Sequence, residues 1–321
     1  MNINSFAMRD VFLERIWQEM ASNPSIFFVS ADFGSPVLDK IREDFSDRFV
    51  NVGIAEQNLI NITAGLAIEG FTVFAYAIAP FITMRCYEQI RVSLALLSEV
   101  RPMNVNLIGV GAGYSYVVSG PTHQCYEDIT IMRALPNFQV LSPADHITAD
   151  KLFDGCVSSN GLKYLRFDAQ ILPVIYEVEP PKISDGFHVH QQGEKVCLIA
   201  TGFMLHTVFK VADEITKDGH VLGVIDIFNL TNFSTKKLKN TLESYSAIVS
   251  CEEGFSGRGG LDAMLFEFIA NNNLDVKVLS IGVDPGYSFE LGSRMELHEK
   301  VGIGTQSILN KVRPFIKTIS N

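Results

Sequence analysis

The chain has 321 residues, of which 47% are hydrophobic and only 19% are charged, and its formal net charge is −10. The hydrophobic content excludes a disordered protein, and an acidic chain without a large Lys/Arg cluster is not expected to bind nucleic acid. No apolar run approaches the roughly 18 residues of a membrane-spanning helix, and we see no signal-peptide pattern. The five cysteines form no C-x-x-C pair, which indicates a reduced, cytoplasmic protein.

Short apolar, β-branched segments alternate with helical patterns through the first half of the chain. We predict strands at residues 26–30, 48–52, 71–76, 103–109, 138–141 and 162–167. We predict helices at residues 56–69, 81–97 and 149–158. Strands that are apolar on both faces and separated by helices indicate a mostly parallel sheet with helices on both faces, an α/β fold.

The alternation pauses after residue 175, where paired prolines and mixed charges are typical of a linker. It then resumes, with strands predicted at 195–201, 221–227, 247–251 and 276–281 and helices at 205–218, 261–272 and 306–312. The last helix is expected to stop before Pro314. The sequence therefore predicts two α/β domains, at residues 1–178 and 194–321, joined by a linker at 179–193.

Four segments carry side chains suited to chemistry. Glu56 follows the strand that ends near Val52 and begins a helix, a position that favours a carboxylate, although a first-turn acid with a structural role is an alternative. Phe81, at the start of the next helix, is suited to stacking on a flat ring or to the core. His123 lies in a loop flanked by turn residues, and Arg166 near a strand end could bind a phosphate or pair with a surface acid.

The order of these segments resembles the C-terminal half of transketolase, and the resemblance covers nearly the whole chain. Its motifs are Glu-Gln at 56–57, Glu-Gln-Ile-Arg at 88–91, Gly-Pro-Thr-His-Gln at 120–124, Leu-Arg-Phe at 165–167 and Cys-Glu-Glu-Gly at 251–254. Ser-Ala-Asp at 30–32 and Leu-Ser-Pro-Ala-Asp at 141–145 also fit. The resemblance implies a pyrimidine-binding domain for thiamine diphosphate followed by a transketolase C-terminal domain.

The resemblance also implies roles around the cofactor. The glutamate that matches Glu56 hydrogen-bonds N1′ of the aminopyrimidine, which promotes removal of the C2 proton of the thiazolium. Aromatic residues surround the pyrimidine in this family. Phe81 is the best chemical match, whereas an ungapped alignment places Ile82 and Arg85 at those positions.

Other matched residues concern the substrate. By resemblance, His123 faces the reacting carbons and serves proton transfer or oxyanion stabilisation. Arg166 matches a residue that holds the sugar phosphate, and Ser35 is the nearest candidate for a second phosphate contact. Ser119 and Gly111 stand where transketolases usually carry an aspartate and a histidine that contact donor hydroxyls. These replacements put the usual donor, xylulose 5-phosphate, in doubt and leave a different ketose, a deoxy sugar or a 2-oxo acid such as pyruvate open as donors.

The sequence contains no Gly-Asp-Gly, the motif with which thiamine enzymes hold Mg²⁺ and the diphosphate. By resemblance, a partner N-terminal subunit that carries this motif must complete the site, in an α2β2 heterotetramer. A large apolar interface would also account for the low charge of the chain.

Three functions are open at this point. The first is a subunit of a two-chain transketolase that transfers a two-carbon ketol or acyl unit. The second is an enzyme like deoxyxylulose-phosphate synthase or the beta subunit of an oxoacid dehydrogenase. The third is a non-catalytic scaffold subunit, which the presence of both Glu56 and His123 argues against.

Overall fold

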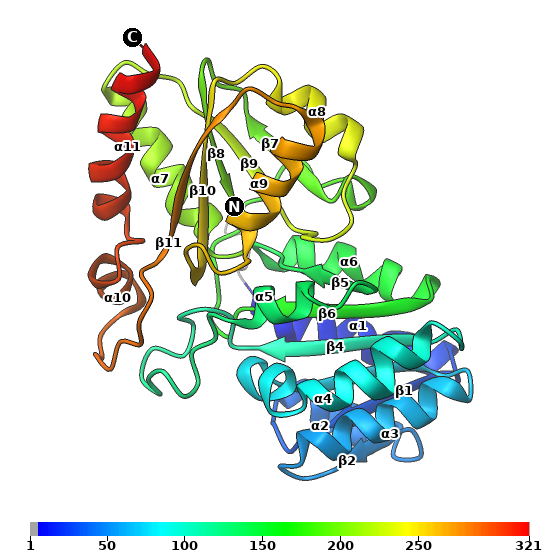
Figure 1. Ribbon diagram of the computed structural model, residues 1–321. Helices are drawn as coiled ribbons and strands as arrows, with labels where there is room; N and C mark the ends of the chain where they lie inside the picture. Colours follow the sequence, from blue (N-terminus) through cyan, green and yellow to red (C-terminus); the bar gives the residue numbers. More distant parts are fainter. Residues whose placement is uncertain (1–5, 321) are drawn as a thin grey trace. The chain divides into compact units, whose positions relative to one another are not determined.

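The computed structural model describes residues 6–320 and divides into two compact units (Figure 1). The first unit comprises the chain up to Ala112 together with Ile131–Pro180. The second comprises Gly113–Thr130 together with the chain from Pro181 onward. Within the described residues, no helix is long and apolar enough to cross a membrane.

The first unit contains a six-stranded sheet in the order β2-β1-β3-β4-β6-β5, and all its strand pairs are parallel. Its strands are β1 (Ile26–Ser30), β2 (Phe49–Asn51), β3 (Thr72–Ile78), β4 (Asn104–Val110), β5 (Phe138–Leu141) and β6 (Gly161–Phe167). Its helices include α1 (Met8–Ser22), α2 (Pro36–Asp44), α3 (Glu56–Ile68) and α6 (His146–Ser158), while α5 (Asp128–Arg133) runs across the division between the units.

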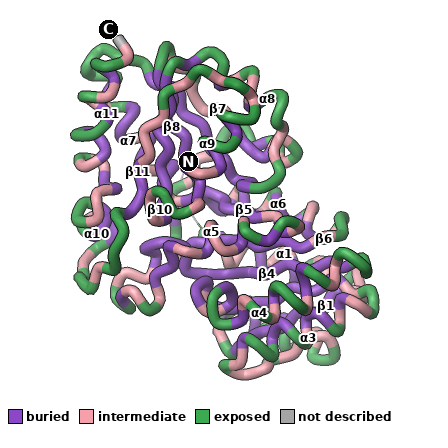
Figure 2. Tube along the Cα trace, viewed as in Figure 1, coloured by how far each residue is buried: buried purple, intermediate pink, exposed green. Residues whose placement is uncertain are grey.

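The centre of this sheet forms the core of the first unit. Every residue of β4 and all but the last of β3 are buried, and Figure 2 shows β4 in purple. The ring of Phe12 on α1 packs edge-on against Phe74, Phe153 and Phe167, at centroid distances of 6.1, 5.4 and 5.1 Å. Strands buried on both faces by helices are the arrangement that the sequence predicts, and the predicted fold class is confirmed.

The single helix predicted at residues 81–97 is wrong in detail. The segment consists of a π-helix (Phe81–Arg85), a short α4 (Tyr87–Gln89) and a second π-helix (Ile90–Leu96). Thr83 Oγ1 donates to the Ala79 carbonyl oxygen (2.6 Å) and Cys86 Sγ donates to the Ile82 carbonyl oxygen (2.9 Å). Such side-chain bonds compete with the regular backbone pattern, and single π-turns are common at functional sites.

The second unit contains a five-stranded sheet in the order β11-β10-β8-β9-β7. The strands are β7 (Phe187–Gln191), β8 (Val196–Ala200), β9 (Gly223–Ile227), β10 (Ala247–Phe255) and β11 (Lys277–Val283), of which only β7 is antiparallel to its neighbour. The helices are α7 (Met204–Lys217), α8 (Thr235–Leu242), α9 (Leu261–Asn272), α10 (Arg294–Lys300) and α11 (Thr305–Ser320).

Two features of the second unit differ from the sequence-based expectations. Residues 179–193, expected to be a linker, include a 3₁₀ turn (Ile183–Asp185) and the strand β7, which pairs with β9. The helix expected to end before Pro314 continues through it to Ser320. Ile308, Val312 and Ile316 form a buried stripe on α11, which packs against α7. This burial outweighs the hydrogen bond lost at the proline.

Candidate active site

Four strands of the first unit end next to residues that the sequence singles out. Glu56 follows β2, Phe81 follows β3, Gly111 follows β4, and Arg166 lies within the last two residues of β6. All of these strands are parallel, so their carboxyl ends lie along the same edge of the sheet. This edge is where ligands bind in open α/β sheets.

The turn between β2 and α3 sets the position of Glu56. Gly53 adopts φ +74°, a left-handed conformation that glycine enters at low cost. Asn51 Oδ1 accepts from the backbone N–H groups of Gly53 (2.9 Å) and Asp32 (3.1 Å), and its Nδ2 donates to Asp32 Oδ1 (2.9 Å). Asn51 thus joins the ends of β1 and β2, and α3 begins with a carboxylate in its first turn.

Glu56 is buried and pairs with an arginine from the π-helix. Only 3% of the Glu56 side chain is exposed, and its Oε2 accepts from Arg85 Nη1 at 2.7 Å. The Arg85 side chain is 42% exposed, and its guanidinium carbon lies 4.2 Å from the centre of the Phe81 ring. The structure therefore gathers a carboxylate, a guanidinium and an aromatic face, three of the residues that the sequence selects.

Two apolar residues close to Arg85 in the chain, Ile82 and Cys86, are fully buried. The Ile82 side chain is inaccessible to solvent. Burial, together with the nearby Glu56 charge, raises the pKa of the Cys86 thiol to about 12. Cys86 therefore stays protonated and is not a nucleophile at neutral pH.

The other candidates of the first unit differ in what their side chains do. Arg166 is buried and lies opposite Gly109 in the ladder between β4 and β6. Gly111 has φ +107° and donates its N–H to the Phe167 carbonyl oxygen (2.9 Å). The Ser35 hydroxyl donates to Asp10 Oδ1 (3.0 Å) and accepts from the Val37 N–H (3.4 Å) at the start of α2. Ser35 therefore acts here as a helix cap.

Ser119 and His123 belong to the second unit, although the sequence places them within residues 1–178. They lie on a loop whose ends are joined by an antiparallel bridge. Gly113 N donates to the Cys125 carbonyl oxygen and Cys125 N donates to the Gly113 carbonyl oxygen, each at 3.0 Å. We call residues 113–125 the histidine loop.

The tip of the histidine loop orients the imidazole. Ser119 is exposed, whereas His123 is half-buried and follows a turn in which its N–H donates to the Gly120 carbonyl oxygen (3.1 Å). Thr122 Oγ1 lies 2.9 Å from His123 Nδ1 and donates to the Ser119 carbonyl oxygen (3.4 Å). Because the Thr122 hydroxyl donates its proton to the Ser119 carbonyl oxygen, its oxygen accepts from His123 Nδ1–H. This favours the histidine tautomer in which Nε2 is the proton acceptor.

Sequence reasoning missed a buried charged cluster in the second unit. Glu253, at the end of β10, accepts from Arg294 Nε and Nη2 (3.0 and 2.9 Å) and from His298 Nε2 (2.7 Å) at the same oxygen, Oε1. Burial alone would raise its pKa, but Arg294 and His298 hold the pKa of Glu253 well below its usual value. The i, i+4 spacing of Arg294 and His298, which places a guanidinium and an imidazole on one helix face, was the available signal.

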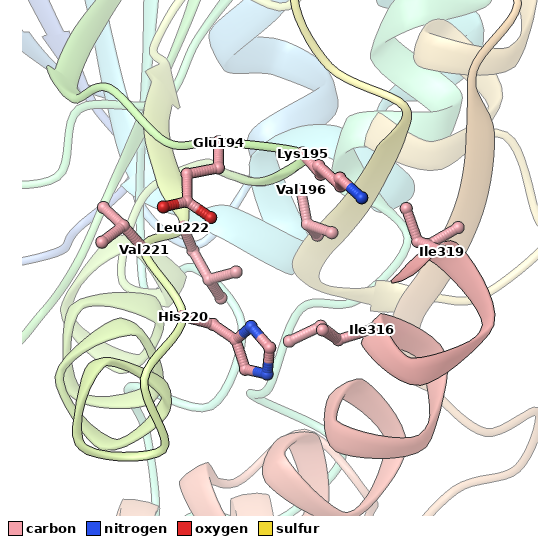
Figure 3. Close-up of a pocket in the computed structure, with 8 residues that line it drawn as sticks. All are labelled: Glu194, Lys195, Val196, His220, Val221, Leu222, Ile316 and Ile319. Carbon is pink, nitrogen blue, oxygen red and sulfur yellow. The ribbon is translucent and has the colours of Figure 1, made fainter. Parts of the chain in front are cut away.

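Two other features lie outside this candidate site. No group of His, Cys, Asp or Glu suited to hold a metal ion occurs in residues 6–320. A pocket of about 110 Å³ lies at the amino ends of β8 and β9, the opposite edge of the second sheet from Glu253. In Figure 3, His220 points toward Ile316 of α11 in this pocket.

Comparison with known proteins identifies the family. Residues 4–174 match the model "Transketolase, pyrimidine binding domain" and residues 186–308 match "Transketolase, C-terminal domain". The chain belongs to the transketolase family. The predicted resemblance, the fold and the assignment as a transferase of the transketolase type are therefore confirmed.

Individual relatives are similar over nearly their whole length. An apulose-4-phosphate transketolase subunit of Actinobacillus succinogenes is 28% identical, over 96% of this chain and 97% of that protein. A 6-deoxy-6-sulfo-D-fructose transketolase subunit of a Clostridium species is 25% identical, over 94% and 92%. The solved structure of a split gene transketolase, an inactive beta4 tetramer, superimposes with a TM-score of 0.82 at 26% identity, over 97% and 98%.

Membership of the transketolase family implies dependence on thiamine diphosphate, and the first unit fits one part of that cofactor. A buried carboxylate on Glu56 and an aromatic face on Phe81 suit a flat, hydrogen-bonding pyrimidine ring. A diphosphate–metal complex needs oxygen ligands for the cation, and residues 6–320 contain no acidic cluster suited to hold one. The side chains at the carboxyl edge of the first sheet thus suit the pyrimidine part of the cofactor.

Proposed function

We propose that this chain is the pyrimidine-binding subunit of a two-chain transketolase whose partner holds the diphosphate and Mg²⁺. The observation that carries the proposal is the buried carboxylate of Glu56 at the carboxyl edge of the first sheet, next to Phe81 and Arg85. Burying a carboxylate costs free energy that one hydrogen bond from a half-exposed arginine offsets only in part, and such groups are found most often where they bind a ligand or take part in catalysis. The alternative of a non-catalytic scaffold offers no reason to keep it.

Glu56 holds a proton at the pyrimidine in this proposal. Arg85 bonds Oε2, so Oε1 is the oxygen that would take the hydrogen of N1′. Thiamine diphosphate, when bound, supplies an acidic carbon and an electron sink for cleaving the bond beside a carbonyl. Phe81 would stack on the ring, and the buried Ile82 would keep water from the carboxylate.

The substrate residues would act on a ketose phosphate. Arg166, buried near the end of β6, would hold the phosphate through paired hydrogen bonds. His123, with Nε2 as acceptor, would move a proton at the substrate hydroxyl or carbonyl oxygen. Because Ser35 is already bonded to Asp10 and the Val37 N–H, its proposed phosphate contact would require it to leave one of these bonds.

Ser119 and Gly111 support a donor other than xylulose 5-phosphate. A serine and a glycine remove the charged and imidazole groups that would bind donor hydroxyls, and a site that lacks such groups loses selectivity for those hydroxyls. Two relatives are named for other ketoses, apulose 4-phosphate and 6-deoxy-6-sulfo-D-fructose. We propose a ketose that carries an anionic group as donor, in the cytoplasm.

Exposed apolar side chains support a partner surface on the first unit. Met84, Val92, Leu96 and Val100 are 40%, 44%, 53% and 74% exposed, and all lie on or just after the helical segment that carries Arg85. Ile54, just before α3, is 75% exposed. Relatives of nearly the same length are named as subunits, and one of split-gene type forms an inactive tetramer alone. We propose an α2β2 assembly in which the partner covers this segment.

The test is hydrogen–deuterium exchange at C2 of thiamine diphosphate, measured by proton NMR in the complex of both chains with Mg²⁺. Glu56→Gln keeps the shape of the side chain and removes its ability to hold the proton at N1′. We expect the exchange rate to fall by about 100-fold or more. Asp39→Asn is the matched control, because Asp39 is an exposed carboxylate of the first unit that pairs with Arg42 on α2, away from the segment proposed to meet the partner.

Three results decide the proposal. Normal C2 exchange in folded Glu56→Gln would refute the role of Glu56. Tight calorimetric binding of thiamine diphosphate and Mg²⁺ by this chain alone would refute the split site. A screen of ketose phosphates against pyruvate then identifies the donor, and a preference for pyruvate would replace the ketose donor with a 2-oxo acid.

A further inference from the structure

The base of the histidine loop rests on the buried charged cluster of the second unit. Tyr114 N donates to Glu253 Oε1 at 3.3 Å. Gly113 adopts φ +54°, and a Cβ built on it would overlap the Glu253 carboxylate. The start of the loop therefore lies directly on this carboxylate, with no room for a larger residue.

Several donors hold the Glu253 carboxylate in one orientation. Arg294 donates to both oxygens, with Nη2 at 2.9 Å from Oε1 and 2.8 Å from Oε2. His298 donates from Nε2 to Oε1 at 2.7 Å. The Arg294 guanidinium carbon lies 3.5 Å from the centre of the Phe203 ring, so the guanidinium also packs on an aromatic face. Arg294 and His298 both come from α10, which begins with a capping box formed by Ser293 and Glu296.

The contacts continue from the carboxylate to the tip of the loop. The ring of Tyr114 lies 5.4 Å from His298 and 4.8 Å from Tyr126. The Tyr126 hydroxyl donates to Oε1 of Gln124, the residue that follows His123. Tyr114, Gln124 and Tyr126 are each at most 2% exposed. A continuous set of packed, hydrogen-bonded side chains thus leads from Glu253 to the neighbour of the loop histidine.

Stability alone does not account for this cluster. A buried carboxylate with buried cationic partners stabilises a fold no better than apolar side chains of the same volume. Its bidentate geometry instead defines one orientation. We propose that Glu253, held by Arg294 and His298, is a positioning residue that sets the place of the histidine loop and thereby of Ser119 and His123 for the substrate.

Amide hydrogen exchange in the complex with the partner chain measures this role directly. The variants are Glu253→Gln and the milder Arg294→Lys. The lysine keeps a positive charge but lacks the two guanidinium nitrogens that bond both carboxylate oxygens. Amides of residues 113–125 are expected to exchange about tenfold or more faster, while amides of β8 and β9 keep their rates. Glu214→Gln is the matched control, because Glu214 makes an exposed ion pair with Lys217 in the same unit and should change nothing.

The effect on the reaction rests on the proposed function. With the best ketose phosphate donor from the screen, kcat/KM is expected to fall about 10- to 100-fold, because a misplaced catalytic group loses effective concentration. The dissociation constant of thiamine diphosphate should stay within about twofold, since the loop concerns substrate. Adding Glu253→Gln to His123→Ala should have little further effect, because the carboxylate acts through the loop.

The outcomes separate the two proposals. A folded Glu253→Gln or Arg294→Lys variant with unchanged exchange in residues 113–125 would overturn the positioning role, and so would faster exchange spread evenly over the second unit. Additive losses in the double variant would overturn it as well. If His123→Ala alone keeps full kcat/KM, the proposed substrate role of His123 fails, whereas the exchange data still decide what positions the loop.

Discussion

Each unit contains a buried glutamate paired with an arginine, and the two pairs are built differently. In the first unit, the Glu56 side chain is 3% exposed while Arg85 is 42% exposed. In the second unit, Glu253 and Arg294 are 1% and 4% exposed, and His298 and the Tyr114 N–H add further bonds to the carboxylate. Glu56 thus pairs with an arginine at the surface, whereas Glu253 has hydrogen-bond partners on both oxygens inside the protein.

The difference indicates two uses of the same pair of side chains. A carboxylate that must take and release a proton needs an oxygen available to a ligand and a partner that can move. Arg85 is half exposed and bonds only Oε2 of Glu56. Glu56 therefore keeps one oxygen available to a ligand and a partner with room to move. A carboxylate that positions a loop needs the opposite, with every oxygen occupied and every partner fixed. Glu253 has this second arrangement.

The largest expected difference between the two pairs is in stability. Arg294→Leu leaves the Glu253 charge buried without its main partner, and we expect the free energy of unfolding to fall by about 3–5 kcal/mol. Arg85→Leu also leaves a buried carboxylate without its arginine, but it removes a single hydrogen bond from a half-exposed partner, so a smaller loss of about 1–3 kcal/mol is expected. Urea denaturation of each variant, followed by circular dichroism, measures both. Equal losses would show that the two pairs are not different in kind.

The fold was largely predictable because its strands are short, apolar and separated by helices. β3 and β4, buried along nearly their whole length, give the strongest signal of this type. The extension of α11 through Pro314 was not predictable from local rules, since it depends on packing against α7. The strand β7 was missed because prolines and charges precede it and its only neighbour, β9, is distant in the chain.

The candidate site was predictable only in part. The motif around Glu56 marks its position, but the bond to Arg85 depends on the π-helical turn, which no periodicity indicates. The Cys-Glu-Glu-Gly motif drew attention to Glu253, yet its partners Arg294 and His298 come 41 and 45 residues later. Membership of the histidine loop in the second unit follows from these long-range contacts, which are not encoded locally.

Two glycines extend the comparison to the backbone beside each carboxylate. Gly113 and Gly53 both have positive φ, at +54° and +74°, but only Gly113 touches a carboxylate, whereas the space around Gly53 is open. We expect Gly53→Ala to cost about 1 kcal/mol of stability, from backbone strain alone. Gly113→Ala adds a steric overlap with Glu253 and should cost about 2–3 kcal/mol more. Thermal unfolding of the two variants side by side tests the difference, and similar shifts would contradict the contact.

Acid is expected to weaken the second unit through Glu253. Arg294 and His298 hold the folded-state pKa of Glu253 well below its usual value of 4.5, so below this pH the unfolded chain binds the proton first. The stability that Glu253 contributes is complete above about pH 4.5 and is lost as the pH falls toward the folded pKa.

Between about pH 4.5 and 3, the free energy of unfolding should therefore fall more steeply in the unchanged protein than in Glu253→Gln, by up to about 1.4 kcal/mol per pH unit. Urea titrations across this range measure the slopes of the unchanged protein and of Glu253→Gln. If the two slopes coincide, Arg294 and His298 do not keep Glu253 ionised, and the contrast with Glu56 would have to be drawn on exposure alone.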